Sequence, residues 1–164
     1  MSSVTSTTAD GSYKINTTIP IKVTFSEAVY VTGTPQLTLE TGSSDAVVNY
    51  SSGSGSNTLT FNYTIATGHA TNDLDYTATN SSALNGGTIK DGAGNTSVLT
   101  LASPGATNSL GANKALVVDG VVATVSSVSS TISDGTYKTN DVILMCEVME
   151  AHGAARSKTL LFSS

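Results

Sequence analysis

Two aspartates separated by one residue carry the clearest chemical signal in this sequence. Asp73 and Asp75 stand in the segment NDLDY, so on a β-strand their carboxylates would point to the same face. A hard cation would relieve their mutual repulsion, and calcium takes about six to eight oxygen ligands from carboxylates and carbonyls on flexible loops. Calcium binding is therefore the first chemical hypothesis for this chain.

Residues that could support hydrolysis are scarce. A catalytic nucleophile needs a neighbouring base that a third group orients, and His69 is the only histidine before the C-terminal tail. His69 stands in TGHATND between expected strands, which favours a surface loop. Cys146 and His152 in the tail are too few for zinc, which takes three or four ligands. With no phosphate-binding or dinucleotide-binding motif, we expect no enzymatic activity.

The composition is typical of a β-protein exposed to water. Apolar residues make up 38% and charged residues only 12% of the chain, against about 25% charged in an ordinary soluble domain. Thr, which favours strands, and Gly and Asn, which favour turns, are abundant. The net charge of −5 argues against partners that select basic patches, such as nucleic acid and anionic membrane surfaces. No apolar run is long enough for membrane insertion.

Alternation of apolar and polar residues predicts the strands. It is clearest in TIPIKVTFS, which places Ile19, Ile21, Val23 and Phe25 on one face. Further strands are expected at 37–39, 46–50, 59–65, 74–78, 88–89, 98–101 and 114–118, and the flexible stretch SSGSGS predicts a hairpin tip at 51–56. No segment of helical periodicity is evident. About seven to nine short strands separated by turns predict an antiparallel β-sandwich.

The chain also contains the beginning of a second copy of itself. Residues 4–16 read VTSTTADGSYKIN and residues 128–140 read VSSTISDGTYKTN, with 8 identical positions out of 13 at an offset of 124. Self-similarity at a fixed period indicates a repeat unit. We therefore expect one module at residues 3–125, followed by the start of a second.

The second copy departs from the first after about residue 142. The positions that correspond to Ile19, Ile21, Val23 and Phe25 are occupied by Ile143, Met145, Glu147 and Met149. A glutamate that faced a core would cost more free energy than it contributes unless it were paired. We therefore expect residues 126–164 to be a truncated or degenerate second repeat that is poorly ordered.

Several phrases resemble a known family. SEAV, LDY, DGAGN and NKALVVD, together with the spacing of the strands between residues 4 and 125, are similar to the long immunoglobulin-like repeats found in tandem in large bacterial surface and adhesin-type proteins. The resemblance implies an immunoglobulin-like β-sandwich. It also implies an extracellular or cell-surface location, with an export signal outside this sequence, because the first residues lack the basic start and apolar run of a secretory signal.

An immunoglobulin-like order of strands gathers carboxylates at the two ends of the module. Asp10, Asp73, Asp75 and Asp119 would share the end at which the chain leaves, where calcium could stiffen the junction with the next module. Glu27, Asp91 and Asn95 would lie at the opposite end. Turn formation is the alternative for the aspartates that precede glycine, and a tyrosine corner that packs the core is the alternative for the segment around Tyr76.

These observations predict a non-catalytic structural or adhesive repeat, a rigid spacer or adhesion module of a bacterial cell-surface or secreted protein. Its expected partners are neighbouring repeats of the same chain and a cell-surface protein or glycan. The alternative is a carbohydrate-binding or accessory module of a secreted enzyme. Sugar sites usually offer exposed aromatic rings, and the module has no Trp, which leaves Tyr30 and Tyr50 as the obvious platform.

Overall fold

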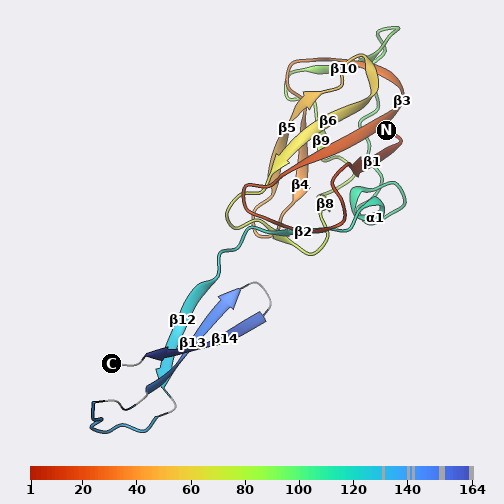
Figure 1. Cartoon of the computed structure of the whole chain (residues 1–164). Coiled ribbons are helices and arrows are strands. Elements are labelled where there is room, and N and C mark those ends of the chain that lie inside the picture. Colours follow the sequence, from red (N-terminus) through yellow and green to blue (C-terminus); the bar gives the residue numbers. More distant parts are fainter. Residues whose placement is uncertain (131, 140, 142, 152–153, 163–164) are drawn as a thin grey trace. The chain divides into compact units, whose positions relative to one another are not determined.

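The computed structural model divides the chain into two compact units (Figure 1). Unit 1 comprises Met1–Gly120 and unit 2 comprises Val121–Ser164. The structure describes residues 1–130, 132–139, 141, 143–151 and 154–162, with only the backbone described after residue 143. Unit 1 ends at Gly120, a few residues before the end of the first module predicted at residues 3–125. The strand β12 (Thr124–Ser130) belongs to unit 2.

The alternating segment of unit 1 forms the central strand β3 (Thr18–Thr32). Along one edge, β3 pairs with β1 (Ser3–Ser6) in its N-terminal part and with β10 (Thr88–Asp91) in its C-terminal part. Along the other edge it pairs with β6 (Ser56–Thr64). The four apolar residues at 19, 21, 23 and 25 are all buried. The sequence prediction for this strand is therefore confirmed.

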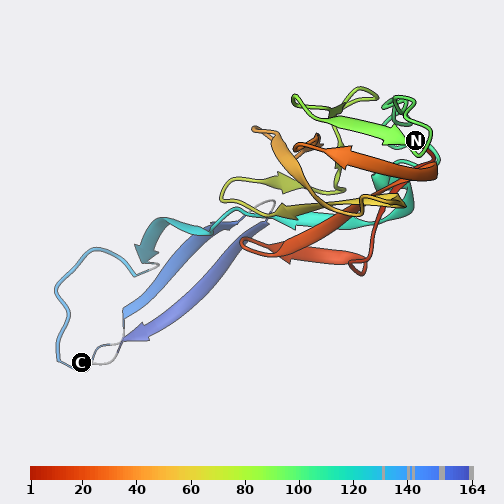
Figure 2. The ribbon, with the colours of Figure 1, turned by 90° about the horizontal axis from the view of Figure 1, so that it is seen from above.

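The sheet continues from β6 through the hairpin partner β5 (Ala46–Ser52) to β4 (Gln36–Glu40), which also pairs with β8 (Asp75–Tyr76) and β9 (Ser82–Ala83). All of its pairings are antiparallel. A smaller sheet holds β11 (Leu116–Asp119) between β2 (Gly11–Lys14), to which it is parallel, and β7 (Ala70–Thr71) (Figure 2). The prediction of an all-β sandwich is confirmed, whereas the immunoglobulin-like assignment stays a prediction.

One hydrophobic core joins the two sheets of unit 1. Its largest fully buried side chains come from five strands, one short helix and the connecting loops: Tyr63, Tyr76, Phe61, Ile19, Ile21, Leu37, Leu39, Leu59, Ile65, Leu74, Ile89 and Leu110. Each fully buried aliphatic or aromatic side chain contributes roughly 1.5–3 kcal/mol. The described part of the chain has no helix long and apolar enough to cross a membrane.

Unit 1 contains strands that the sequence did not predict, namely β1, β2, β7 and β9, and it also departs from the prediction in one expected strand and one helix. Residues 98–101 form no strand, although Leu101 is 5% exposed and joins the core from an irregular segment. A short helix, α1 (Leu110–Asn113), occurs where none was expected, and the hydroxyl of its N-cap residue Ser109 accepts from the Ala112 N–H. Four residues are too few to produce a visible helical period in a sequence.

The tip of the β5–β6 hairpin depends on glycine. Gly53 has φ of +111°, and a side-chain carbon placed there would lie 2.1 Å from the carbonyl oxygen of Thr58. The predicted hairpin is confirmed, with a register shift between Tyr50 and Ser52.

Unit 2 is a three-stranded antiparallel sheet in which β13 (Ile143–Ala151) lies between β12 and β14 (Ala154–Phe162). β12 pairs with β13 in the register in which β1 pairs with β3. Val4 is the partner of Val23 in unit 1, and Val128 is the partner of Glu147 in unit 2, each shifted by 124 positions. The repeat seen in the sequence is thus also a repeat of strand pairing. The expected poor order of residues 126–164 concerns their stability and stays a prediction.

Candidate functional site

Asp75 belongs to the acidic group that the sequence singled out, and its carboxylate accepts three hydrogen bonds from the backbone. The residue is 8% exposed on β8. Its Oδ1 accepts from the N–H of Tyr76 at 2.9 Å and of Leu110 at 3.2 Å, and its Oδ2 accepts from the N–H of Gly105 at 2.9 Å. Asp75 therefore fixes the loop around Gly105 and the start of α1 against β8.

The carboxylates of Asp73 and Asp75 both lie next to Gly111 of α1. A side-chain carbon placed on Gly111 would be 3.0 Å from Oδ2 of Asp75 and 3.1 Å from Oδ2 of Asp73. Asp73 is exposed as a whole, but partial desolvation of its carboxyl group, followed by the charge of Asp75, raises its pKa above the ordinary value, against a lowering by the Leu116 N–H. The two carboxylates therefore come close together, as their spacing in the sequence predicted.

Asp10 and Asp119 occupy different positions at the same sheet. Asp10 pairs with Lys114, with Oδ1 and Nζ 2.7 Å apart, and also accepts from the Ala115 N–H at 3.2 Å. These two bonds hold the pKa of Asp10 below its ordinary value. Asp119 ends β11, where its backbone is the partner of Lys14 and Ala70.

These four aspartates do not form a metal centre within unit 1. Among the described residues, no group of three or more His, Cys, Asp and Glu is arranged to hold a metal ion. Asp75 uses three of its lone pairs on backbone N–H groups and Asp10 is neutralised by a lysine. Calcium at these positions would need further oxygen ligands from a neighbouring module, and it stays a prediction.

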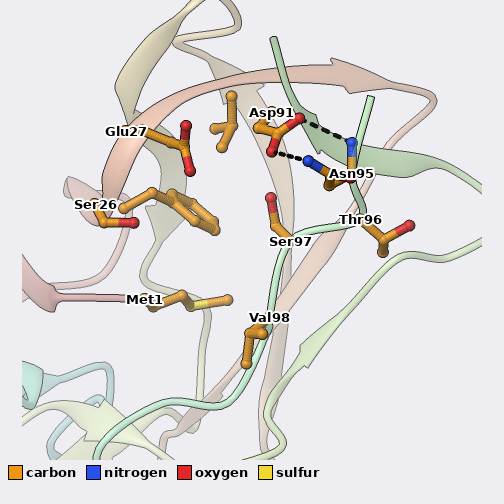
Figure 3. A pocket seen from close by; sticks show the side chains of 10 residues that line it. Met1, Ser26, Glu27, Asp91, Asn95, Thr96, Ser97 and Val98 are labelled. Carbon is orange, nitrogen blue, oxygen red and sulfur yellow. Dashed lines mark hydrogen bonds between the residues drawn. The ribbon is translucent and has the colours of Figure 1, made fainter. Parts of the chain in front are cut away.

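A pocket of about 210 Å³ lies where β3 bulges away from β6. The pairing of β3 with β6 jumps from Thr24 to Val29, and the extra residues carry Glu27 to the pocket. A bulge of this kind re-aims side chains at the end of a sheet. Figure 3 shows the carboxylates of Glu27 and Asp91 at one end of the pocket, with Met1 and Val98 at the other.

Asp91 in this pocket is itself held by its own turn. Its carboxylate accepts from the N–H groups of Ala93 and Asn95, at 2.9 and 2.8 Å, and from the Asn95 side-chain amide at 2.8 Å. The side-chain bond from Asn95, followed by its backbone N–H, lowers the pKa of Asp91. The structure thus brings Glu27, Asp91 and Asn95 together as expected, and Asp91 acts there as a turn-forming residue.

His69 lies in the loop between β6 and β7, as predicted, but its ring is a packing element. It stacks on the ring of Tyr63 with centroids 5.7 Å apart, and its Nδ1 lies 2.9 Å from the Tyr63 hydroxyl. Nδ1 also accepts from the Ala66 N–H at 3.3 Å, so the neutral ring carries its proton on Nε2. His152 lies outside the described residues, and the side chain of Cys146 is not described.

The same loop clamps the last residue of unit 1. Gly120 donates to the carbonyl of His69 at 2.7 Å and accepts from Gly68 at 3.0 Å. A side-chain carbon on Gly120 would lie 2.2 Å from the carbonyl oxygen of Ala66. The point at which the chain leaves unit 1 is therefore fixed by backbone contacts that only glycine permits.

The tyrosines divide into buried and exposed members. Tyr76 is 1% exposed and donates to the carbonyl of Ala102 at 2.7 Å. The alternative interpretation of Tyr76 as a residue that packs the core is therefore confirmed. Its hydroxyl does not make the bond of a tyrosine corner, because it reaches a loop 26 residues downstream instead of a nearby upstream carbonyl. Burial, followed by the Asp75 charge, raises the pKa of Tyr76 to about 12.

Of the two tyrosines proposed as a sugar platform, Tyr30 is exposed and Tyr50 is half-buried. Tyr50 accepts from the Ser54 N–H and packs edge-on against Phe61, with ring centroids 6.2 Å apart. Tyr30 is 53% exposed and borders a shallow groove that Thr32, Thr88 and Lys90 also line.

No protein-family model, curated protein or solved structure matches this chain.

Proposed function

We propose that unit 1 is a non-catalytic structural module of a tandem array, a rigid spacer or adhesion module of a bacterial protein at the cell surface or in the extracellular medium. The observation that carries the proposal is the repeated strand register, in which β12 meets β13 as β1 meets β3 at an offset of 124 residues. A module whose opening is repeated in both sequence and pairing is built to be used in series.

Features at the exit of unit 1 support a spacer. Gly120 is clamped by the loop at 66–69, and the preceding strand β11 is held between two others. A fixed exit limits the directions in which a following module can point. Such restriction distinguishes a spacer from a set of domains joined by a flexible linker.

The experiment completes the second module. Residues 141–164 are replaced with residues 17–120, so that the second opening is followed by its natural continuation. We expect each of the two modules to unfold cooperatively. We also expect small-angle X-ray scattering that fits one extended arrangement of the two modules. A second module that stays unfolded, or scattering from freely reorienting domains, would contradict the proposal.

Calcium at the junction is tested in the same two-module protein. We expect binding heat in calorimetric titration and a melting temperature that falls when a chelator is added. The control is D73N, which keeps an oxygen acceptor but removes one carboxylate from the predicted ligands. Absence of binding heat and of any chelator effect would leave the aspartates with structural roles alone.

A carbohydrate-binding module is the second candidate, and the exposed ring of Tyr30 favours it. Side-chain carbons on Gly55 and Gly92 would approach the Tyr30 ring to 3.8 and 3.7 Å, so the two glycines keep the space beside the ring open. Glycan-array binding that is lost in Y30A but kept in Y30F would support this function. Binding that persists in Y30A would remove the aromatic platform on which it depends.

A further inference from the structure

Two side-chain hydrogen bonds near the start of unit 1 recur at the equivalent positions near the start of unit 2. The Ser6 hydroxyl accepts from the Thr8 N–H at 3.1 Å, and the Ser130 hydroxyl accepts from the Ile132 N–H at the same distance. Tyr13 donates to the carbonyl of Ala9, and Tyr137 donates to the carbonyl of Ser133, which is the corresponding pair at an offset of 124. Two local hydrogen bonds of residues 3–14 therefore recur at the equivalent positions of residues 127–138.

The two copies differ in what covers them. Val4 is 1% exposed, and its backbone is held by Asn108 and by the side chain of Asn113. Val128, at the equivalent position, is 56% exposed and is the register partner of Glu147. The unit 2 copy thus presents an apolar side chain that the unit 1 copy buries.

The second half of the opening shows a similar difference. In unit 1, residues 11–14 form β2 and pair with β11. In unit 2, residues 135–138 form no strand, and the described part of unit 2 contains no counterpart of β11. Tyr137 is accordingly exposed.

The buried positions of the first copy are preserved in the second. Val4 and Ser6 are the two buried residues between positions 1 and 16, and both are unchanged as Val128 and Ser130. The Ser6 hydroxyl donates to the carbonyl of Pro20 at 2.8 Å, a bond that Ser130 could supply equally. Asp134 likewise stands where Asp10 pairs with Lys114.

We propose that residues 127–138 of one chain replace β1 and β2 in unit 1 of a second copy of the chain. In the exchanged state Val128 lies opposite Val23 instead of Glu147, and residues 135–138 gain β11 as a partner. The acceptor's own β1 and β2 are released. Each chain has one donor segment and one acceptor site, so the contact is heterologous and produces rings or open chains. The proposal does not depend on the module's role as a spacer or adhesin.

Because the acceptor's own β1 is tethered to it, exchange competes with an intramolecular strand. We therefore expect exchange to become visible when β1 is weakened or when chains refold together at high concentration. The test uses the full-length chain with V4D, which places a carboxylate at the buried position opposite Val23, and with V128D at the exposed position. V128D alone is the matched control, since its side chain lies at the surface.

Sedimentation and thermal melting are measured over a concentration series. We expect V4D to form larger species than the wild type, with a melting temperature that rises with concentration, and V4D/V128D to be monomeric at every concentration. Equal association of V4D and V4D/V128D would show that another surface is responsible. A monomeric V4D would also overturn the proposal, whether or not its stability depended on Val128.

A second measurement avoids the destabilised variants. K22C and S129C chains, both carrying C146S, are mixed, unfolded, refolded together and mildly oxidised. Lys22 is the register partner of Thr5, the position that Ser129 would occupy after exchange. We expect a disulfide-linked pair of the two variants, and none when N49C on β5 replaces K22C. Equal cross-linking to both positions would contradict the proposed register.

Discussion

Replacing Asp75 with asparagine tests whether this carboxylate is a structural anchor. The side chain is buried and accepts three backbone N–H groups at 2.9, 3.2 and 2.9 Å. Asparagine keeps one acceptor oxygen for Tyr76 and Leu110 but turns an amide N–H₂ toward the Gly105 N–H. We therefore expect one hydrogen bond to be lost and two to lose their charge assistance.

The magnitude follows from these three bonds. An unsatisfied donor costs about 1–3 kcal/mol, and a bond to a charged group is worth roughly 1 kcal/mol more than a neutral one. Gly105 is exposed, so water can satisfy part of its N–H. The sum is a loss of about 2–4 kcal/mol in the free energy of unfolding, which lowers the melting temperature by roughly 10 °C.

The assay is urea unfolding of the full-length chain, and the matched control is D73N. Asp73 is exposed and asparagine preserves an acceptor for the Leu116 N–H, so D73N should change the free energy of unfolding by no more than about 0.5 kcal/mol. If D75N cost less than about 1 kcal/mol, or if both variants cost the same, the structural role assigned to Asp75 would be refuted.

Three other predictions concern unit 1. The ion pair with Lys114 lowers the pKa of Asp10, so its contribution to the free energy of unfolding is complete above the ordinary pKa of 3.8 and is lost as the pH falls through the lowered pKa. When the stability of D10N is measured against pH, this acid loss should be absent. The raised pKa of Asp73 has the opposite effect on the pH dependence of stability. The free energy of unfolding should fall as the pH rises from 3.8 through the raised pKa, and D73N should abolish this fall. G53A should cost at least about 1 kcal/mol more than G68A in urea unfolding, because both glycines have positive φ but only a side chain at position 53 meets backbone, 2.1 Å from Thr58; equal costs would contradict the clash.

The strands were largely predictable because their side chains alternate between core and solvent. Ile19, Ile21 and Val23 show this pattern in the sequence and are buried in the structure. Leu101 broke the rule, because an irregular segment can bury one leucine without forming a strand. Local periodicity therefore located the sheet well but not the loops that close the core.

The acidic group was predictable only in part. The spacing of Asp73 and Asp75 correctly placed their carboxylates together, but two of the three hydrogen-bond donors to Asp75 are the N–H groups of Gly105 and Leu110, at least 30 residues away. Which of two neighbouring carboxylates is buried depends on such long-range contacts. Residue spacing alone could not separate a structural anchor from a ligand.

The parallel pairing of β2 with β11 has a mechanical consequence. β2 lies near the N-terminus of unit 1 and β11 near its C-terminus, and the two strands run in the same direction. When the ends of the unit are pulled apart, load that reaches this pair acts along the strands in shear. All of its hydrogen bonds then resist together instead of opening one after another. The backbone hydrogen bonds of Gly120 with the loop at 66–69 keep the C-terminal end of β11 from being peeled away before the load reaches the strand.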